Sequence, residues 1–161
     1  MSVKVSPLEA HLGYWLRYVS NQVSHAFAQK LAARDVTVAE WVMLRELYDH
    51  DPATPGERER GSITPSDLAE RLGMTRGAIS KLTDRLAAKG LVLRESNGDD
   101  RRYQTVVLTK AGRVLLPALA ALADQNDAEF FAALSEKERA AIEAAMKKIV
   151  AQLGLRAVPV D

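Results

Sequence analysis

The sequence predicts a mainly α-helical fold with one small β-hairpin, and three observations support this prediction. Apolar residues recur at spacings of three and four through much of the 161-residue chain, which is the period of an amphipathic helix. Two short segments, at 91–95 and 103–108, are predicted strands, and the second is rich in β-branched residues. They flank a turn over residues 96–102 that contains Asn-Gly. A chain of this length fits one domain, with extensions that form a dimer.

Composition narrows the class of protein. Hydrophobic residues make up 47% and charged residues 27%, as is ordinary for a soluble globular protein. The absence of cysteine excludes disulfides and thiolate metal sites. The chain starts without a signal-peptide core, and no apolar run approaches the roughly 20 residues that span a bilayer. We therefore expect a cytoplasmic protein with no membrane partner.

The charge of the chain is unevenly distributed although the net charge is only +1. Residues 62–110 hold 9 lysines and arginines against 6 aspartates and glutamates, an excess of +3. A local basic segment is the electrostatic signature expected of a module that binds nucleic acid.

The first expected helix spans residues 7–34 and is longer than a small monomeric core requires, so we interpret it as partly a dimerisation element. Its apolar stripe consists of Leu8, Leu12, Leu16, Val19, Val23, Phe27 and Leu31. Thr37 and Glu40 form a capping box that opens a second helix, which ends near Asp49. Residues 50–61 mix Pro, Gly and charge without apolar periodicity, which predicts a loop.

The next segment predicts a helix-turn-helix. Thr64 caps a short helix that Gly73 ends, and Thr75 caps a second helix over residues 75–89, which ends at Gly90. Two short helices joined by a tight glycine-containing turn form this motif. We expect the second helix to be the recognition helix.

A β-hairpin over residues 91–108, a wing, follows the recognition helix directly. Thr109 is expected to cap a further helix that is kinked or restarted at Pro117. Ser135 and Glu138 form another capping box, which opens the last helix. The predicted architecture is a winged helix-turn-helix with long N- and C-terminal dimerisation helices.

The recognition helix carries the residue types that read DNA. A helix fits the roughly 12 Å major groove, where arginine and lysine reach guanine, while serine and threonine bind phosphates or base edges. Taken alone, the basic side chains would be read as a solvated helix face. The order of a capped helix, a glycine turn, a basic helix and an arginine-tipped hairpin favours DNA binding instead.

Residues 68–112 resemble the MarR family of winged helix-turn-helix regulators. The motifs that carry the likeness are "SKLTDRL", Asp100-x-Arg102, and the "LT-x-x-G" of Leu108, Thr109 and Gly112. The flanking helices also fit, so the resemblance covers nearly the whole chain. The 50–61 loop departs from the family pattern, since it is longer than the usual connection.

The resemblance implies a homodimer joined by the helices of 1–34 and 111–161, with a DNA-binding lobe over 37–110, on a pseudo-palindromic operator. It implies that Arg102 enters the minor groove while Asp100 orients the wing, and Arg101 is a candidate for the phosphate backbone. We expect a repressor. The predicted DNA-binding residues are Thr64, Thr75, Arg76, Gly77, Ser80, Lys81, Arg85, Asp100, Arg101 and Arg102.

The resemblance also implies release by a small ligand, often an aromatic or phenolic acid. A polar-aromatic stripe on the first helix, with a cation nearby and a tryptophan on the next helix, forms a candidate pocket. Its residues are His11, Tyr14, Trp15, Arg17, Tyr18 and Trp41. The alternative is that these aromatic residues pack in the core or at the dimer interface.

Catalytic chemistry has no matching motif. His11, His25 and His50 lack metal-ligand spacing, and the adjacent Ser24 and His25 point about 100° apart on a helix. We expect no enzyme activity, metal or cofactor. The remaining alternative is a winged helix that binds protein rather than DNA, which would not need several arginines and lysines on one surface.

Overall fold

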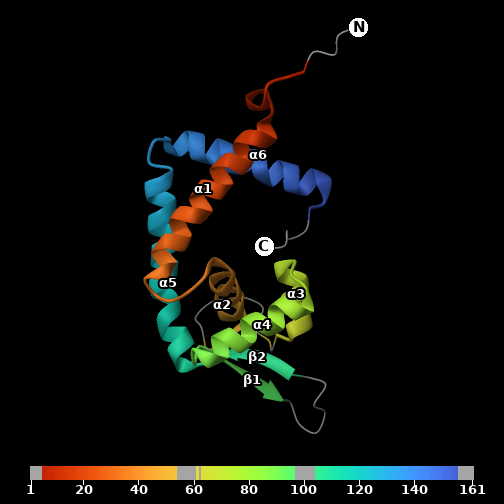
Figure 1. Cartoon of the computed structure of the whole chain (residues 1–161), viewed down its shortest axis with the longest axis vertical. Helices are drawn as coiled ribbons and strands as arrows, with labels where there is room; N and C mark the ends of the chain where they lie inside the picture. Colours follow the sequence, from red (N-terminus) through yellow and green to blue (C-terminus); the bar gives the residue numbers. More distant parts are fainter. Residues whose placement is uncertain (1–4, 54–60, 62, 97–103, 156–161) are drawn as a thin grey trace.

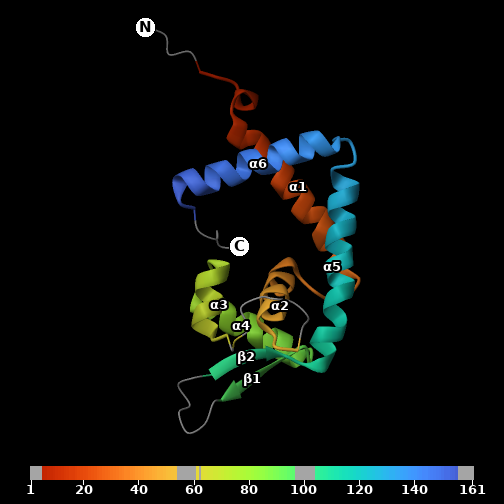
Figure 2. The same cartoon turned by 180° about the vertical axis from the view of Figure 1, so that it is seen from behind.

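A computed structural model of the protein describes residues 5–53, 61, 63–96 and 104–155, and long helices dominate the structure (Figure 1). Helix α5 runs along one side, from the small sheet at one end of the molecule to α6 at the other, as both views show (Figure 2). The elements in chain order are η1 (Leu8–Ala10), α1 (Leu12–Ala32), α2 (Val38–His50), α3 (Pro65–Leu72), α4 (Arg76–Ala88), β1 (Val92–Ser96), β2 (Gln104–Leu108), α5 (Lys110–Phe130) and α6 (Glu136–Leu153).

The hydrophobic core lies mainly where α2, α3, α4 and the sheet meet. Met43 and Leu44 of α2 and Leu68 of α3 are fully buried there, together with Ile79 and Leu86 of α4. Helix α1 buries only its penultimate residue, and no residue of α6 is buried. The two ends of the chain therefore carry apolar side chains that the described part of the protomer leaves uncovered.

Side-chain caps fix the beginnings of helices α2 to α6, and the sequence predicted these caps correctly. The Thr37 and Ser135 capping boxes form as expected at the starts of α2 and α6. Thr75 accepts from the Ala78 N–H at 3.1 Å, and Thr109 accepts from the Gly112 N–H at 3.0 Å. Each cap satisfies a backbone donor that the first helical turn leaves unpaired.

The N-terminal end differs from the expected helix over 7–34. Residues Leu8–Ala10 form a separate 3-10 turn, and His11 has extended backbone angles, φ −102° and ψ 124°, so α1 begins only at Leu12. The imidazole Nδ1 of His11 lies 3.2 Å from the Pro7 carbonyl oxygen, and the indole N–H of Trp15 donates to the Glu9 carbonyl at 2.9 Å. These bonds satisfy carbonyls that a continuous helix would have used, and they stabilise the break.

Helix α5 does not restart at Pro117, because it runs unbroken over Lys110–Phe130.

The hairpin confirms the expected wing at its base. Strands β1 and β2 pair antiparallel from Val92 with Leu108 to Ser96 with Gln104. The tip, including Asn97, Gly98, Asp100, Arg101 and Arg102, lies outside the described residues.

Ile63 adds a third strand-like contact that the sequence did not predict. The N–H of Val106 donates to the Ile63 carbonyl oxygen at 3.0 Å, and the two residues form an antiparallel bridge. The segment entering α3 is thereby fixed to the wing. Within the described residues, no helix is long and apolar enough to cross a membrane.

Candidate nucleic-acid interface

The turn between α3 and α4 has the geometry of a helix-turn-helix. Gly73 ends α3 with the left-handed angles φ 63° and ψ 26°, which glycine adopts without strain. The Met74 N–H then donates to the Ala69 carbonyl at 3.0 Å, and Thr75 caps α4. A left-handed residue and a cap within three positions turn the chain sharply and place α4 against α3.

Helix α4 has one buried face and one exposed face. Its buried side chains are Ile79, Leu82, Thr83 and Leu86. The hydroxyl of Thr83 has its hydrogen-bond partner within the helix, since it donates to the Ile79 carbonyl at 2.8 Å. At 100° per residue, Lys81 lies opposite this buried face. The exposed side chains of the helix include Arg76, Ser80, Lys81, Asp84 and Arg85.

Gly77 lies in the first turn of the exposed face of α4. A Cβ atom built at this position meets no atom within 4 Å. No other part of the described chain covers the backbone here. This agrees with the expectation that a ligand can approach the helix closely at Gly77.

Thr64 and Arg85, two of the predicted DNA-binding residues, are directed toward partners within the chain. The hydroxyl of Thr64 donates to the Asp67 carboxylate at 2.7 Å and accepts the Asp67 N–H at 3.2 Å, so it caps α3. The hydrogen bonds from Thr64 also lower the pKa of Asp67. Arg85 lies on the α2 side of α4, where its Nε is 3.9 Å from Oε1 of Glu40. These two side chains are thus directed differently from Arg76 and Lys81.

Arg94 and Asp84 belong to this surface although the sequence analysis did not select them. Nη1 of Arg94, on β1, lies 2.8 Å from the Asp84 carboxylate on α4, and Nη2 is 3.4 Å from the Ser80 hydroxyl. Arg94 compensates the acidic residue on the exposed face and ties the wing to the recognition helix. A period of two along the strand places Arg94 on the same face as the buried Val92. This signal could have identified Arg94 from the sequence.

The residues of the predicted ligand pocket separate into two groups. Tyr14 contacts Trp15 edge-on, with ring centroids 5.2 Å apart, and stacks on Tyr18 at 6.2 Å. Trp41 instead packs edge-on against Phe27 at 5.9 Å, beside the core. Phe27 lies thirteen positions after Tyr14 on α1, a rise of about 20 Å at 1.5 Å per residue. Within one protomer, Trp41 therefore does not lie beside Tyr14.

The other two members of the predicted pocket lie near the first group. Arg17 is exposed on α1, one residue before Tyr18, and His11 is exposed at the break before α1. The Nδ1 atom of His11 is already close to two backbone carbonyl oxygens. No group of three or more His, Asp or Glu side chains among the described residues is arranged to hold a metal ion.

A tight glycine turn, an exposed basic second helix and a hairpin ion-paired to that helix define a winged helix-turn-helix protein. A model described as the MarR family matches residues 34–102. The regulator PrsX of Escherichia coli is 30% identical over 148 residues, 91% of this chain and 84% of that protein. The repressor NicR of Pseudomonas putida is 28% identical over 161 residues, 93% of this chain and 96% of that protein.

A solved structure of MepR from S. aureus in complex with DNA has the same fold. Its TM-score is 0.74 at 26% identity, and the match covers 88% of this chain and 98% of that one. The chain belongs to the MarR family, as the motifs over 68–112 predicted. It is accordingly a DNA-binding transcriptional regulator and not an enzyme.

Proposed function

We propose that this protein is a cytoplasmic repressor that binds a pseudo-palindromic operator as a homodimer and is released by a small aromatic ligand. The exposed basic face of α4, beside a wing that is ion-paired to it, is the observation that carries the proposal. The similar NicR is a transcriptional repressor, and the similar MepR has been solved with DNA.

In the proposed complex the first turns of α4 enter the major groove. Arg76, Lys81 and Ser80 meet base edges or phosphates, while Gly77 and the cap residue Thr75 allow close approach of the backbone. Arg85, on the flank of α4, binds the phosphate backbone of the DNA.

The wing would extend this contact into the minor groove, where the negative potential of the DNA is concentrated. Arg102 inserts there, Asp100 orients the tip and Arg101 binds phosphate. The paired strands and the Arg94–Asp84 ion pair support this part of the proposal, because they fix the base of the wing beside α4.

The dimer is proposed to form through residues 1–34 and 111–161, since the described part of the protomer leaves apolar stripes there uncovered. In α6 the exposed side chains Ile142, Met146, Ile149 and Leu153 recur every three or four residues, on one face of the helix. In α1 the stripe continues through Leu12, Leu16 and Val19, which are also exposed. An apolar face this long is expected to bury itself against a second copy of the same face.

Three alanine variants test the DNA surface. A duplex is first selected by the wild-type protein from a pool with a randomised interior. Arg76→Ala, Lys81→Ala and Arg102→Ala are each expected to weaken binding of that duplex by about 1 to 3 kcal/mol when a base contact is lost. Fluorescence anisotropy titrations against the duplex and its single-base variants measure both the affinity and the discrimination at each position.

Lys148→Ala is the matched control, because it removes a lysine from α6, at the opposite end of the molecule from the sheet. It should bind the duplex like the wild-type protein. An equal loss in Lys148→Ala and Lys81→Ala would mean that only total charge matters. Unchanged affinity in all three variants would remove α4 and the wing from the interface.

The ligand site is proposed around Tyr14, Trp15 and Tyr18, with His11 and Arg17 supplying polar contacts; Trp41 is left out because it packs beside the core. Tyr14→Ala is expected to blunt release of DNA by salicylate, a phenolic acid, while leaving DNA binding intact. Phe27→Leu, which alters the other aromatic pair, serves as the control. A normal response of Tyr14→Ala to salicylate in the anisotropy assay would assign the stripe to packing.

A further inference from the structure

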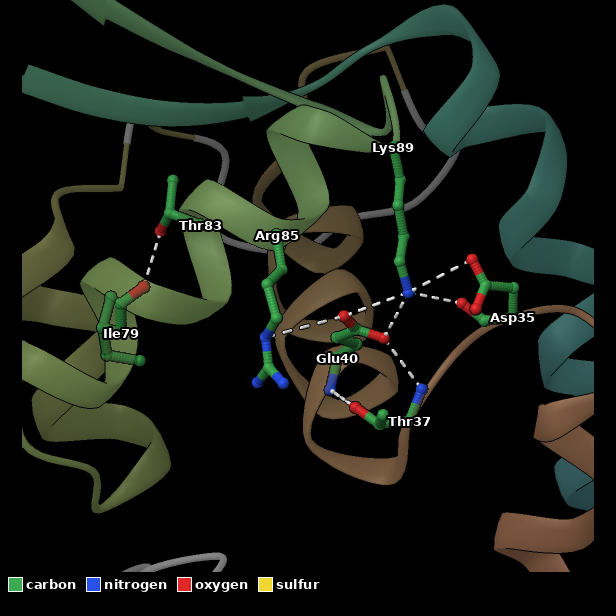
Figure 3. A network of polar contacts seen from close by, with 7 residues as sticks. All are labelled: Asp35, Thr37, Glu40, Ile79, Thr83, Arg85 and Lys89. Carbon is green, nitrogen blue, oxygen red and sulfur yellow. Dashed lines mark hydrogen bonds and ion pairs between the residues drawn. The ribbon is translucent and has the colours of Figure 1, made fainter.

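The buried carboxylate of Glu40 joins α2 to the far end of the recognition helix (Figure 3). Glu40 is only 1% exposed, although it carries a charge and lies in the first turn of α2. A buried charge is costly unless partners compensate it. The identity of these partners shows what the residue connects.

The partners of Glu40 come from both helices. Its Oε2 accepts the backbone N–H of Thr37 at 2.8 Å. The ammonium of Lys89, the C-cap residue directly after α4, lies 3.2 Å from Oε1 and 3.0 Å from Oε2. Arg85, one turn earlier in α4, approaches Oε1 to 3.9 Å. Two cations from the C-terminal end of the recognition helix thus converge on one carboxylate at the start of α2.

Lys89 also reaches the corner between α1 and α2. Its ammonium donates to the backbone carbonyl of Asp35 and lies 3.6 Å from the carboxylate of the same residue. Asp35 has a positive φ of 53°, which marks a tight corner of the backbone. The Lys89 ammonium group therefore connects the end of α4 to the corner after α1 and to the start of α2.

These charges stabilise one another. Burial raises the pKa of Glu40, but the hydrogen bond from the Thr37 backbone and the contacts with Lys89 lower it more, so the net pKa lies below its ordinary value. Glu40 is therefore ionised at neutral pH. Removal of Lys89 would leave the buried Glu40 carboxylate with the more distant Arg85, at 3.9 Å, as its cationic partner.

The direction of these contacts distinguishes them from the rest of the packing of α4. On its buried face the helix rests on Ile79, Leu82 and Leu86, and apolar contacts of this kind are not directional. Its other directional contacts, from Arg94 to Asp84 and Ser80, run to the wing and not to α2. Hydrogen-bonded charges hold two elements in a specific geometry. The junction of Glu40 and Lys89 is thus suited to fix the orientation of α4 relative to α2 and the end of α1.

We propose that Glu40 and Lys89 are positioning residues, which set the orientation of the recognition helix and so the affinity for operator DNA without touching DNA. The proposal rests on the DNA-binding role of α4 given above. It also links α4 mechanically to the end of α1, one of the helices assigned to the dimer.

The variant Glu40→Gln tests the proposal through the sign of its effect. Glutamine at this position keeps a capping-box side chain, and the change removes one negative charge, which by electrostatics alone would strengthen DNA binding. Positioning predicts the opposite: affinity for the selected duplex falls by roughly two- to thirtyfold. Binding that is unchanged or tighter overturns the proposal.

Lys89→Met supplies the second half of a double-mutant cycle. Each single variant should lose affinity, and the double variant should lose less than the sum of the two, because the same contact is removed twice. Additive losses would contradict a shared role. Lys30→Met is the matched control, since Lys30 is similarly exposed and forms a 2.7 Å ion pair with Glu129 between α1 and α5, away from α4.

Two further readouts separate orientation from simple loss of folded protein. All titrations are made well below the melting temperature of each variant, against both the selected duplex and a scrambled one. Misorientation of α4 weakens the selected duplex and spares the scrambled one, whose binding depends on phosphate charge. Equal loss on both duplexes would mean that the change does not act through the orientation of α4, and it would overturn the proposal.

Hydrogen exchange makes the test independent of DNA. Backbone amides in the last turn of α4 and the first turn of α2 should exchange faster in Glu40→Gln and Lys89→Met than in the wild-type protein, and unchanged exchange there would overturn the proposal. If the wild-type protein selected no duplex, the proposed function would fail while the junction would still be judged by exchange. If the wild-type protein binds and Glu40→Gln binds equally well, only the junction fails.

Discussion

Gly112→Ala is expected to destabilise the protein by about 3 kcal/mol, the upper end of the usual cost of overpacking. A Cβ atom at Gly112 would lie 2.3 Å from the carbonyl oxygen of Leu91 and 3.2 Å from a methyl group of Leu108. The carbonyl cannot move away freely, because it accepts the N–H of Thr109 at 3.0 Å. Thermal unfolding followed by circular dichroism should show a melting temperature lowered by about 10 °C.

Gly77→Ala is the control for this prediction and has the opposite sign. Gly77 lies inside α4 and a Cβ atom there meets nothing within 4 Å, so alanine should stabilise the helix by roughly 0.5–1 kcal/mol. A Gly112→Ala protein as stable as the wild type would mean that the end of α4 and the start of α5 are not packed as described. The DNA-binding lobe would then be joined to α5 in another way.

Ile149→Glu is expected to convert the dimer into monomers and to lower operator affinity by about a hundredfold, because two linked half-site contacts become two independent ones. The side chain lies on the exposed apolar face of α6, with Met146 one turn earlier. A charge placed there would be buried unpaired in the proposed interface. Analytical ultracentrifugation gives the mass, and anisotropy titration gives the affinity.

Ala151→Glu places the same charge on the opposite face of α6, about 160° from Ile149 around the helix. It should leave both the mass and the affinity unchanged. If Ile149→Glu remains a dimer, the apolar face of α6 is not the contact between protomers. If it becomes a monomer with full affinity, the operator does not need two recognition helices at once.

Local signals in the sequence were sufficient for most of the fold. Threonine and serine caps, Gly73 as a terminator, and the Asn-Gly turn before a segment rich in β-branched residues are signals from residues close together in the chain. The starts of α2 to α6 and the hairpin could therefore be predicted. The break at His11 could not, because it depends on side-chain bonds to backbone carbonyls that compete with the helical pattern. The Ile63 bridge is equally a contact between distant segments.

The candidate site was predicted only where one helix carries it. The exposed face with Arg76 and Lys81 follows from helical periodicity. The attachment of Arg85 to Glu40, separated by 45 positions in the chain, requires the packing of α4 on α2. The pairing of Trp41 with Phe27 likewise depends on how α1 meets α2. Relations between elements had to come from the three-dimensional structure.

The most direct test of sequence-specific DNA binding by this protein is a titration of the wild type against the selected duplex over a series of salt concentrations. We expect the logarithm of the binding constant to fall linearly with the logarithm of the salt concentration, by about 0.9 for each phosphate neutralised. The selected duplex should also bind at least about a thousandfold more tightly than a scrambled one. An affinity that is independent of salt, or equal for the two duplexes, would contradict this function.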